Sequence, residues 1–297
     1  MGIKFGTSGW RGILAEDFTF PNARLVCQAI ADYLHGENLG AQGVVVGHDT
    51  RFLSEAFANV AVEVMAGNGI KSFITDRDTP TPVVSHAIIK GGCAGGINIT
   101  ASHNPGEYNG LKFNPVHGGP APEPVTAAIE ALIRGMRPDD VRSLPFKEAR
   151  QQGWVADFNP RTDYFQQLRS LLDTEVLRRS GLKVIVDVLY GTARDYLDGF
   201  LREVGVAVEV LHGFRDPYFG GHRPEPSSEF LEELARRVQE QGAHLGLAVD
   251  ADADRFGVVN SRGEYHEANE ILPMLLDYLI ETRGCCDEVI AHQNRKV

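Results

Sequence analysis

Three aspartates at alternate positions, Asp250, Asp252 and Asp254, follow a short apolar segment and are followed by Arg255. Their carboxylates can meet at one point only if the loop curls around a cation, because mutual repulsion would otherwise make each bind a proton. Oxygen ligands of this kind favour Mg²⁺ or Ca²⁺ over zinc or copper. The planar guanidinium of Arg255 suits a phosphate beside such a metal. The pattern therefore predicts a metal and phosphate site.

Other interpretations of this acidic segment are a solvated turn, a calcium EF-hand and a phosphatase. The turn is disfavoured because ligand sites in α/β folds follow strands. The EF-hand is disfavoured because the flanking segments are predicted strands and no glutamate closes the loop. A phosphatase with an aspartyl nucleophile stays open, since it also places paired aspartates after a strand.

A second polar segment, Thr100–Pro105, holds Ser102, His103 and Asn104 directly after another predicted strand. Ser102 is a candidate nucleophile that needs a base, a metal or phosphorylation chemistry to activate it. The flanking residues do not match the glycine-flanked elbow of serine hydrolases. Downstream, Lys112 is either a proton shuttle, if desolvation lowers its pKa, or an ordinary surface lysine.

The glycine-rich segment Phe5–Gly12 is a third candidate site. Thr7 and Ser8 stand among glycines that expose backbone N–H groups, and Arg11 adds a fixed cation. This composition suits an anion, although the spacing differs from that of a P-loop. A flexible turn is the alternative.

Short apolar runs alternate with longer amphipathic segments along the chain, which is typical of α/β proteins. We predict two consecutive α/β domains, each with a mixed, mainly parallel sheet flanked by helices, and an incomplete third α/β unit. The predicted boundaries are 1–145, 154–258 and 259–297. The expected strands are 43–47, 71–75, 95–100, 182–188, 207–211, 244–249, 256–260 and 288–291. The expected helices are 21–34, 54–67, 80–89, 164–177, 196–204, 229–240 and 269–283.

Composition excludes several classes of function. The 297 residues include 29 Lys and Arg against 40 Asp and Glu, a net charge of −11 that argues against general nucleic-acid binding. We find no apolar run long enough to span a membrane and no secretory signal. The 4 cysteines form no CxxC pair or zinc-like spacing and indicate reduced thiols in a cytoplasmic protein.

Taken in order, Phe5–Gly12, Thr100–Pro105 and Asp250–Arg255 resemble the signature loops of the α-D-phosphohexomutases, the phosphoglucomutase/phosphomannomutase superfamily. Val44–Arg51 and Asn109–Lys112 also resemble its first domain. Members of this family have four domains, so the resemblance implies domains one and two and the opening of the third. On this basis we expect the chain to be truncated.

The resemblance implies a role for each candidate residue. Ser102 would carry the transferable phosphoryl group, and Asp250, Asp252 and Asp254 would bind Mg²⁺ together with that phosphate. Arg11 and Arg255 would contact phosphoryl oxygens. His103 and Lys112 would be the acid/base candidates. Further phosphate contacts would come from three polar side chains, Thr7, Ser8 and Asn104.

The implied reaction interconverts hexose 1-phosphate and hexose 6-phosphate through a phosphoserine and a bisphosphate intermediate, with glucose 1,6-bisphosphate as activator. The first loop, which contains Trp10, resembles the loops of phosphogluco- and phosphomannomutases more than those of phosphoglucosamine mutases, which implies glucose or mannose phosphates as substrates. Ala251 stands where the family usually has glycine. If the backbone needs a positive φ at this position, the alanine would alter the turn. A weak sugar-phosphate phosphatase and a non-catalytic metal- and phosphate-binding fragment are the alternatives.

Overall fold

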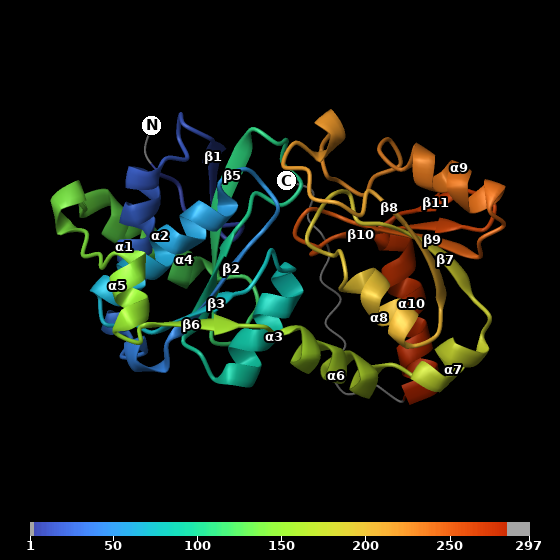
Figure 1. Ribbon diagram of the computed structural model, residues 1–297, viewed down its shortest axis with the longest axis horizontal. Coiled ribbons are helices and arrows are strands. Elements are labelled where there is room, and N and C mark those ends of the chain that lie inside the picture. Colours follow the sequence, from blue (N-terminus) through green and yellow to red (C-terminus); the bar gives the residue numbers. More distant parts are fainter. Residues whose placement is uncertain (1–2, 284–297) are drawn as a thin grey trace.

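Two mixed β-sheets with helices on both faces form the protein, and they lie side by side (Figure 1). The structure, a computed structural model, describes residues 3–283. The predicted α/β class with two helix-flanked sheets is confirmed. No helix in this part of the chain is both long and apolar enough to cross a membrane.

The sheet of the first unit has the strand order β1-β5-β4-β2-β3-β6. Strands β2, β3, β4 and β6 are parallel, while β5 runs antiparallel to β4 and β1 antiparallel to β5. Strands β2 and β4 are buried throughout, and their sequences are accordingly rich in valine, isoleucine and glycine, with His48 and Asn98 as the buried polar exceptions. The strands are Trp10–Ile13 (β1), Val44–His48 (β2), Ser72–Thr75 (β3), Gly95–Ile99 (β4), Tyr108–Pro115 (β5) and Val155–Phe158 (β6).

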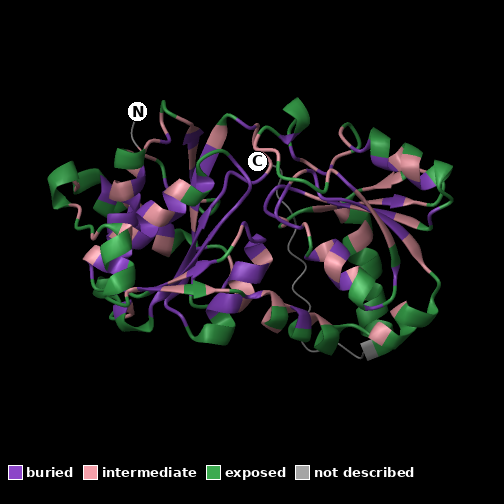
Figure 2. Cartoon of the chain, viewed as in Figure 1, coloured by how far each residue is buried: buried purple, intermediate pink, exposed green. Residues whose placement is uncertain are grey.

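Helices cover this first sheet unequally. The main core lies between one face of the sheet and α1, α2 and α4, whereas α3 packs on the opposite face. Figure 2 shows the resulting band of buried residues along the strands. The helices are Phe20–Gly36 (α1), Ser54–Gly67 (α2), Thr81–Gly91 (α3), Glu123–Gly135 (α4) and Phe146–Gln151 (α5), with 3-10 turns at Gly40–Gln42 and Pro138–Asp140.

The sheet of the second unit has the order β11-β10-β9-β7-β8, with β7, β8 and β9 parallel. Helices α6 and α8 pack on one face and α9 on the other. Its strands are Lys183–Asp187 (β7), Ala207–Leu211 (β8), Leu245–Val249 (β9), Phe256–Asn260 (β10) and Tyr265–His266 (β11). Its helices are Arg161–Leu171 (α6), Thr174–Arg179 (α7), Leu197–Glu203 (α8), Glu232–Glu240 (α9) and Ala268–Arg283 (α10), with a 3-10 turn at Phe219–Gly221.

Several predicted elements and boundaries need correction. Strand β6 pairs with β3 of the first sheet. Residues 155–158 therefore belong to the first unit, and the predicted start of the second domain at residue 154 is too early. Strands β10 and β11 pair with β9, so the second unit continues past residue 258. The helix expected over 164–177 is two helices separated near Leu172 and Asp173, whose carboxylate caps α7. The predicted strand 288–291 lies outside the described residues.

Each sheet has one topological switch point, a place where the strand order reverses direction. In the first sheet the chain passes from β2 to β3 on one side and returns to β4 on the other. In the second sheet it passes from β7 to β8 and returns to β9 in the same way. The crevice at the carboxyl ends of such strands is where ligands bind in open α/β sheets. The segments after β4 and β9 are the predicted Ser102 and aspartate sites.

Candidate active site

Ser102 and the aspartates meet although they belong to different units. The Ser102 hydroxyl donates a hydrogen bond to Oδ2 of Asp250 over 2.7 Å, and both residues are buried. Ser102 has a left-handed backbone with φ +52°, and its amide donates to the Thr100 hydroxyl over 2.9 Å. A non-glycine residue in this conformation is costly and persists only where its surroundings enforce it. We call residues 100–108 the serine loop and residues 250–255 the metal loop.

The metal loop curls as the sequence predicts. One oxygen from each of Asp250, Asp252 and Asp254 lies within 4.8 Å of the others. Oδ1 of Asp250 accepts the amides of Asp254 and Arg255, which closes the turn. Burial, together with the charges of the other two aspartates, raises the pKa of Asp250 well above its usual range. A divalent cation would remove this repulsion.

Asp252 has a buried carboxylate oxygen without a partner. Its Oδ2 accepts bonds from Thr81 and Lys112, whereas its buried Oδ1 has no hydrogen-bond partner among the described residues. A buried carboxylate oxygen without a partner is costly. The three clustered carboxylates, one of which keeps a buried oxygen without a partner, fit a hard divalent cation such as Mg²⁺.

Ala251 causes no backbone strain in the metal loop. The residue with a left-handed backbone in this loop is Ala253, with φ +59°, and not Ala251. Ala251 is buried, and its carbonyl accepts the amide and the hydroxyl of Thr192. An alanine is therefore tolerated at this position, where the family usually has glycine.

Lys112 bridges two of the aspartates and does not behave as a neutral base. Its ammonium lies 2.7 Å from Oδ2 of Asp252 and 2.8 Å from Oδ2 of Asp254. Burial acts to lower the pKa of Lys112, but the two carboxylates outweigh it and raise the pKa above its ordinary value. A proton shuttle at Lys112 was predicted only if desolvation lowered its pKa. This condition is therefore not met.

His103 has the opposite tendency. Burial and the nearby arginines, Arg255, Arg11 and Arg223, lower the pKa of His103 to about 4. Its Nδ1 lies 3.4 Å from the Ser102 hydroxyl. The imidazole is therefore neutral at pH 7 and close enough to exchange a proton at that hydroxyl.

Cations surround the serine loop. Arg11 on β1 donates from Nη1 to Oδ1 of Asn104 over 2.6 Å, and its buried Nε has no partner among the described residues. Arg255 is half-exposed and lies 3.5 Å from Glu225. Its neighbour Arg223, on the loop after β8, contacts the same glutamate at 3.7 Å. Sequence analysis missed Arg223, because nothing in the loop 213–228 indicated where it would lie.

Thr7 and Ser8 occupy the tip of a tight turn closed by two backbone hydrogen bonds between Gly6 and Gly9. Both residues are exposed. Gly9, with φ +77°, packs so closely on β5 that a Cβ would lie 2.3 Å from the Leu111 carbonyl. The turn therefore lies against the strand that carries Lys112. No side-chain hydrogen bond links Thr7 or Ser8 to the serine or metal loop among residues 3–283, so their phosphate-binding role stays a prediction.

Comparison with known proteins assigns the family. The family model described as phosphoglucomutase/phosphomannomutase, alpha/beta/alpha domain I, matches residues 2–138. The model of alpha/beta/alpha domain II of the same family matches residues 162–263. The chain belongs to the phosphoglucomutase/phosphomannomutase family. Both loops of the site lie within the matched residues.

Individual members of this family resemble the chain over most of its length. It is 33% identical to a phosphoglucomutase of Komagataeibacter xylinus over 95% of the chain and 54% of that relative. It is 34% identical to a probable phosphoglucosamine mutase of Methanothermobacter thermautotrophicus over 99% of the chain and 64% of the relative. A phosphomannomutase-like crystal structure from Thermus thermophilus superimposes with a TM-score of 0.85 at 33% identity, covering 95% of this chain and 62% of that one. The chain thus spans between about half and two thirds of these relatives.

Proposed function

We propose that this chain carries the phosphoryl-transfer centre of a phosphohexomutase that interconverts hexose 1-phosphate and hexose 6-phosphate. The observation that supports this most directly is the 2.7 Å contact between the Ser102 hydroxyl and Asp250, which joins the two signature loops. Ser102 would accept a phosphoryl group from a hexose bisphosphate and donate it to the free hydroxyl of a hexose monophosphate. The bisphosphate formed would turn round and return its other phosphate to Ser102.

Asp250, Asp252 and Asp254, with the phosphate on Ser102, would hold Mg²⁺. The bound ion would neutralise charge on the phosphoryl oxygens, which is the main requirement of phosphoryl transfer. The free Oδ1 of Asp252 and the raised pKa of Asp250 support this assignment.

Protein side chains would supply the remaining chemistry. His103, neutral at pH 7, is the candidate base for the attacking hydroxyl. Lys112 stays protonated and offsets the charge of Asp252 and Asp254, and the acid role that the family resemblance implies for it is the part of this assignment that the raised pKa does not support. Phosphate contacts would come from Arg11 and Arg255 and from three polar side chains, Thr7, Ser8 and Asn104.

We propose glucose phosphate, mannose phosphate or both as substrates and glucose 1,6-bisphosphate as activator. Similar relatives carry phosphoglucomutase, phosphoglucosamine mutase and phosphomannomutase names, so the sugar needs direct measurement. Trp10, which belongs to the loop that resembles those of phosphogluco- and phosphomannomutases, is buried against Phe18 at a ring distance of 4.6 Å. It can affect sugar choice only through the position of β1. We also propose a cytoplasmic location, for which the buried free thiols Cys27 and Cys93 give support.

Phosphorus NMR of the chain with each hexose 1-phosphate, Mg²⁺ and glucose 1,6-bisphosphate tests this function. We expect a hexose 6-phosphate signal that disappears with EDTA and with Ser102→Ala. Free inorganic phosphate in its place would indicate the weak phosphatase alternative. Neither product, with Mg²⁺ binding intact by calorimetry, would indicate a non-catalytic binding fragment.

A further inference from the structure

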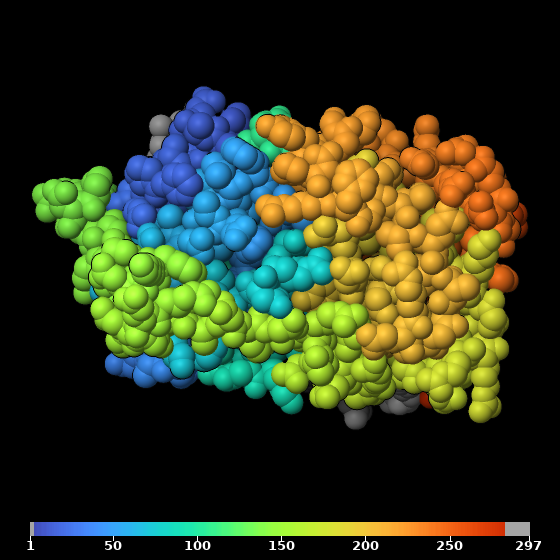
Figure 3. All heavy atoms as spheres, viewed as in Figure 1, coloured from blue at the N-terminus to red at the C-terminus, as the bar shows by residue number. Residues whose placement is uncertain are grey.

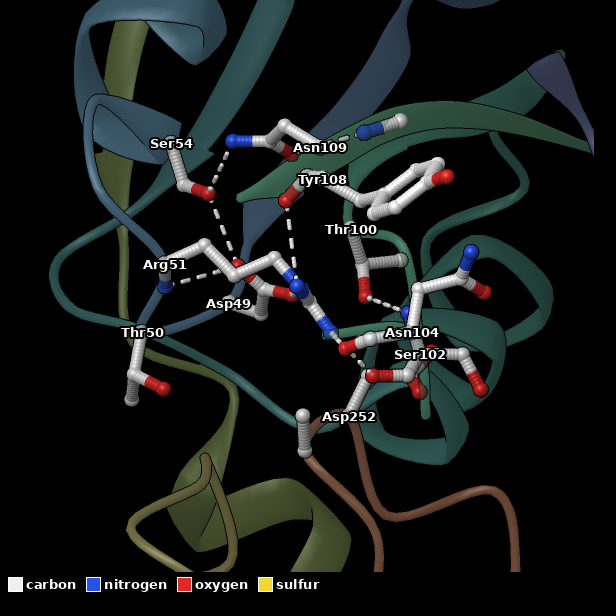
Figure 4. A network of polar contacts seen from close by, with 12 residues as sticks. Asp49, Thr50, Arg51, Ser54, Thr100, Ser102, Asn104, Tyr108, Asn109 and Asp252 are labelled. Atoms are coloured by element: carbon white, nitrogen blue, oxygen red, sulfur yellow. Dashed lines mark hydrogen bonds and ion pairs between the residues drawn. The ribbon is translucent and has the colours of Figure 1, made fainter. Parts of the chain in front are cut away.

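Arg51 lies directly beneath the serine loop and is completely buried. It follows β2 at the switch point of the first sheet, and Figure 4 shows its side chain extending toward Ser102 and Asn104. A buried guanidinium is costly unless all its donors are paired.

All five N–H donors of this guanidinium are used. Nε donates to Oδ2 of Asp49 over 3.1 Å. Nη2 donates to the carbonyls of Ser102 and Asn104 over 2.6 and 2.5 Å. Nη1 donates to two further carbonyls, at 2.6 Å to Pro105 and 3.0 Å to Tyr108. Four of the five bonds therefore fix the backbone of the serine loop and not its side chains.

Asp49 in turn is held by the first unit. Its Oδ1 accepts the hydroxyl of Ser54 over 2.7 Å and the backbone amide of Arg51 over 3.0 Å. Ser54 also accepts the side-chain amide of Asn109 over 2.9 Å. The network therefore connects the carboxyl end of β2, the start of α2 and the start of β5 around one cation (Figure 4).

The second unit covers the remaining face of Arg51. The ring of Phe219, which is buried and has a left-handed φ of +53°, lies 4.8 Å from the Arg51 guanidinium carbon. Nearby, Nε of Arg215 donates to the Thr50 carbonyl over 3.2 Å. The cation that fixes the serine loop is thus in contact with the loop after β8.

We propose that Arg51 is a positioning residue that holds Ser102 in its left-handed conformation and, through Phe219, links the serine loop to docking of the second unit. This inference rests on the proposed phosphoryl transfer at Ser102. Arg51 contacts the serine loop through backbone carbonyls and touches no reacting atom, so we expect its loss to slow transfer more than it weakens binding of the phosphoryl donor. A displacement of about 1 Å at a reacting group can cost about 100-fold in rate.

Arg51→Lys tests the proposal, because lysine keeps the charge but has three donors on a single nitrogen. The single-turnover rate of phosphoryl transfer from glucose 1,6-bisphosphate to Ser102 is measured against donor concentration. We expect the maximal rate to fall about 100-fold, with the half-saturating concentration changed less than about threefold. Arg24→Lys, in a partly buried ion pair with Glu63 elsewhere in the first unit, is the matched control. A maximal rate for Arg51→Lys equal to that of this control would overturn the proposal.

Two further measurements keep the outcome decisive. Phe219→Leu keeps an apolar cover over Arg51 and all five of its hydrogen bonds. We expect this variant to lower the maximal rate about fivefold. If Arg51→Lys does not fold, an unchanged maximal rate in Phe219→Leu overturns the proposal. Hydrogen exchange of the amides in 102–108 needs no catalysis. A wild-type chain that takes up no phosphate would refute the proposed function, whereas unchanged exchange in a folded Arg51→Lys would refute the role of Arg51.

Discussion

Neighbouring basic side chains at this site have opposite pKa shifts, and the cause is local. His103 lies among arginines, so burial and positive charge keep it neutral. Lys112 lies between carboxylates, so it stays charged in spite of burial. Titratable groups whose surroundings separate their pKa values are what acid/base chemistry requires.

A second histidine gives a prediction for stability against pH. His212 donates from Nδ1 to Asp187 over 2.9 Å, and this hydrogen bond raises the pKa of His212 above its ordinary value. The folded state therefore favours the protonated form of His212. The contribution of this hydrogen bond to the free energy of unfolding is complete below about pH 6.5 and is lost as the pH rises through the raised pKa.

Urea unfolding at about pH 6 and pH 8 measures this contribution. We expect the free energy of unfolding to fall by at most about 1 kcal/mol over this interval, since the ring is partly exposed. His212→Asn, which tolerates the left-handed φ of +50°, should remove that part of the fall. An identical pH dependence in the variant would contradict the assignment.

At single positions, the sequence predicted the groups whose chemistry is in their own side chains. Ser102 and the three aspartates were predicted as site residues from residue type, spacing and the family resemblance, and the structure brings them together. Their roles as nucleophile and metal ligands stay predictions. Arg51 could not be predicted in this way, because four of its bonds go to backbone carbonyls, which every residue carries. The pKa of Lys112 also depended on neighbours 140 and 142 residues away.

At the level of elements, the site depends on loops that follow β4 and β9 and meet across two sheets. The parallel strands β2, β3, β4, β7, β8 and β9 were predicted from their short, mainly apolar runs. The parallel edge strand β6 was missed, because only parts of its short sequence are apolar and buried. Strands β1 and β5 were missed because their glycines and polar residues resemble turns. Gly9 and Gly110 in these segments are needed for close backbone approach: a Cβ on Gly110 would lie 2.5 Å from the Thr100 carbonyl.

Gly106 tests how closely the serine loop must approach the second unit. A Cβ there would lie 3.0 Å from the Cα of Tyr218 and 3.1 Å from the Pro217 carbonyl. We expect Gly106→Ala to destabilise the protein by about 1–3 kcal/mol and to slow phosphorylation of Ser102. Gly36→Ala, where a Cβ meets nothing within 4 Å, is the matched control. Equal melting temperatures and phosphorylation rates for the two variants would refute this prediction.

At the scale of the whole molecule, the two units share buried contacts and lie directly against each other (Figure 3). Val83 of α3 packs in the core of the second unit, and the Thr81 hydroxyl donates to Asp252 over 2.6 Å. Arg194 contacts both oxygens of Asp78 at 2.8 and 2.7 Å. The site is therefore complete only when the units are docked.

The Arg194–Asp78 pair predicts how strongly docking contributes to stability. Both side chains are mostly buried, at 15% and 9% exposure, so Arg194→Met would leave the buried Asp78 carboxylate with only its longer, 3.6 Å contact to Arg77 among the ion pairs of the described residues. We expect a loss of about 3 kcal/mol in urea unfolding. Arg150→Met, which breaks the exposed pair with Asp157, should cost less than about 1 kcal/mol. Similar losses in both variants would show that the buried pair contributes no more than a surface one.

The most direct test of the central claim is the intact mass of the chain before and after incubation with Mg²⁺ and glucose 1,6-bisphosphate, followed by peptide mapping. We predict one added phosphate, located on Ser102, and none in Ser102→Ala or in the presence of EDTA. Phosphate on another residue, persistent labelling of Ser102→Ala, or no phosphate in the wild-type chain would contradict the assignment of Ser102 as the phosphoryl carrier of this site.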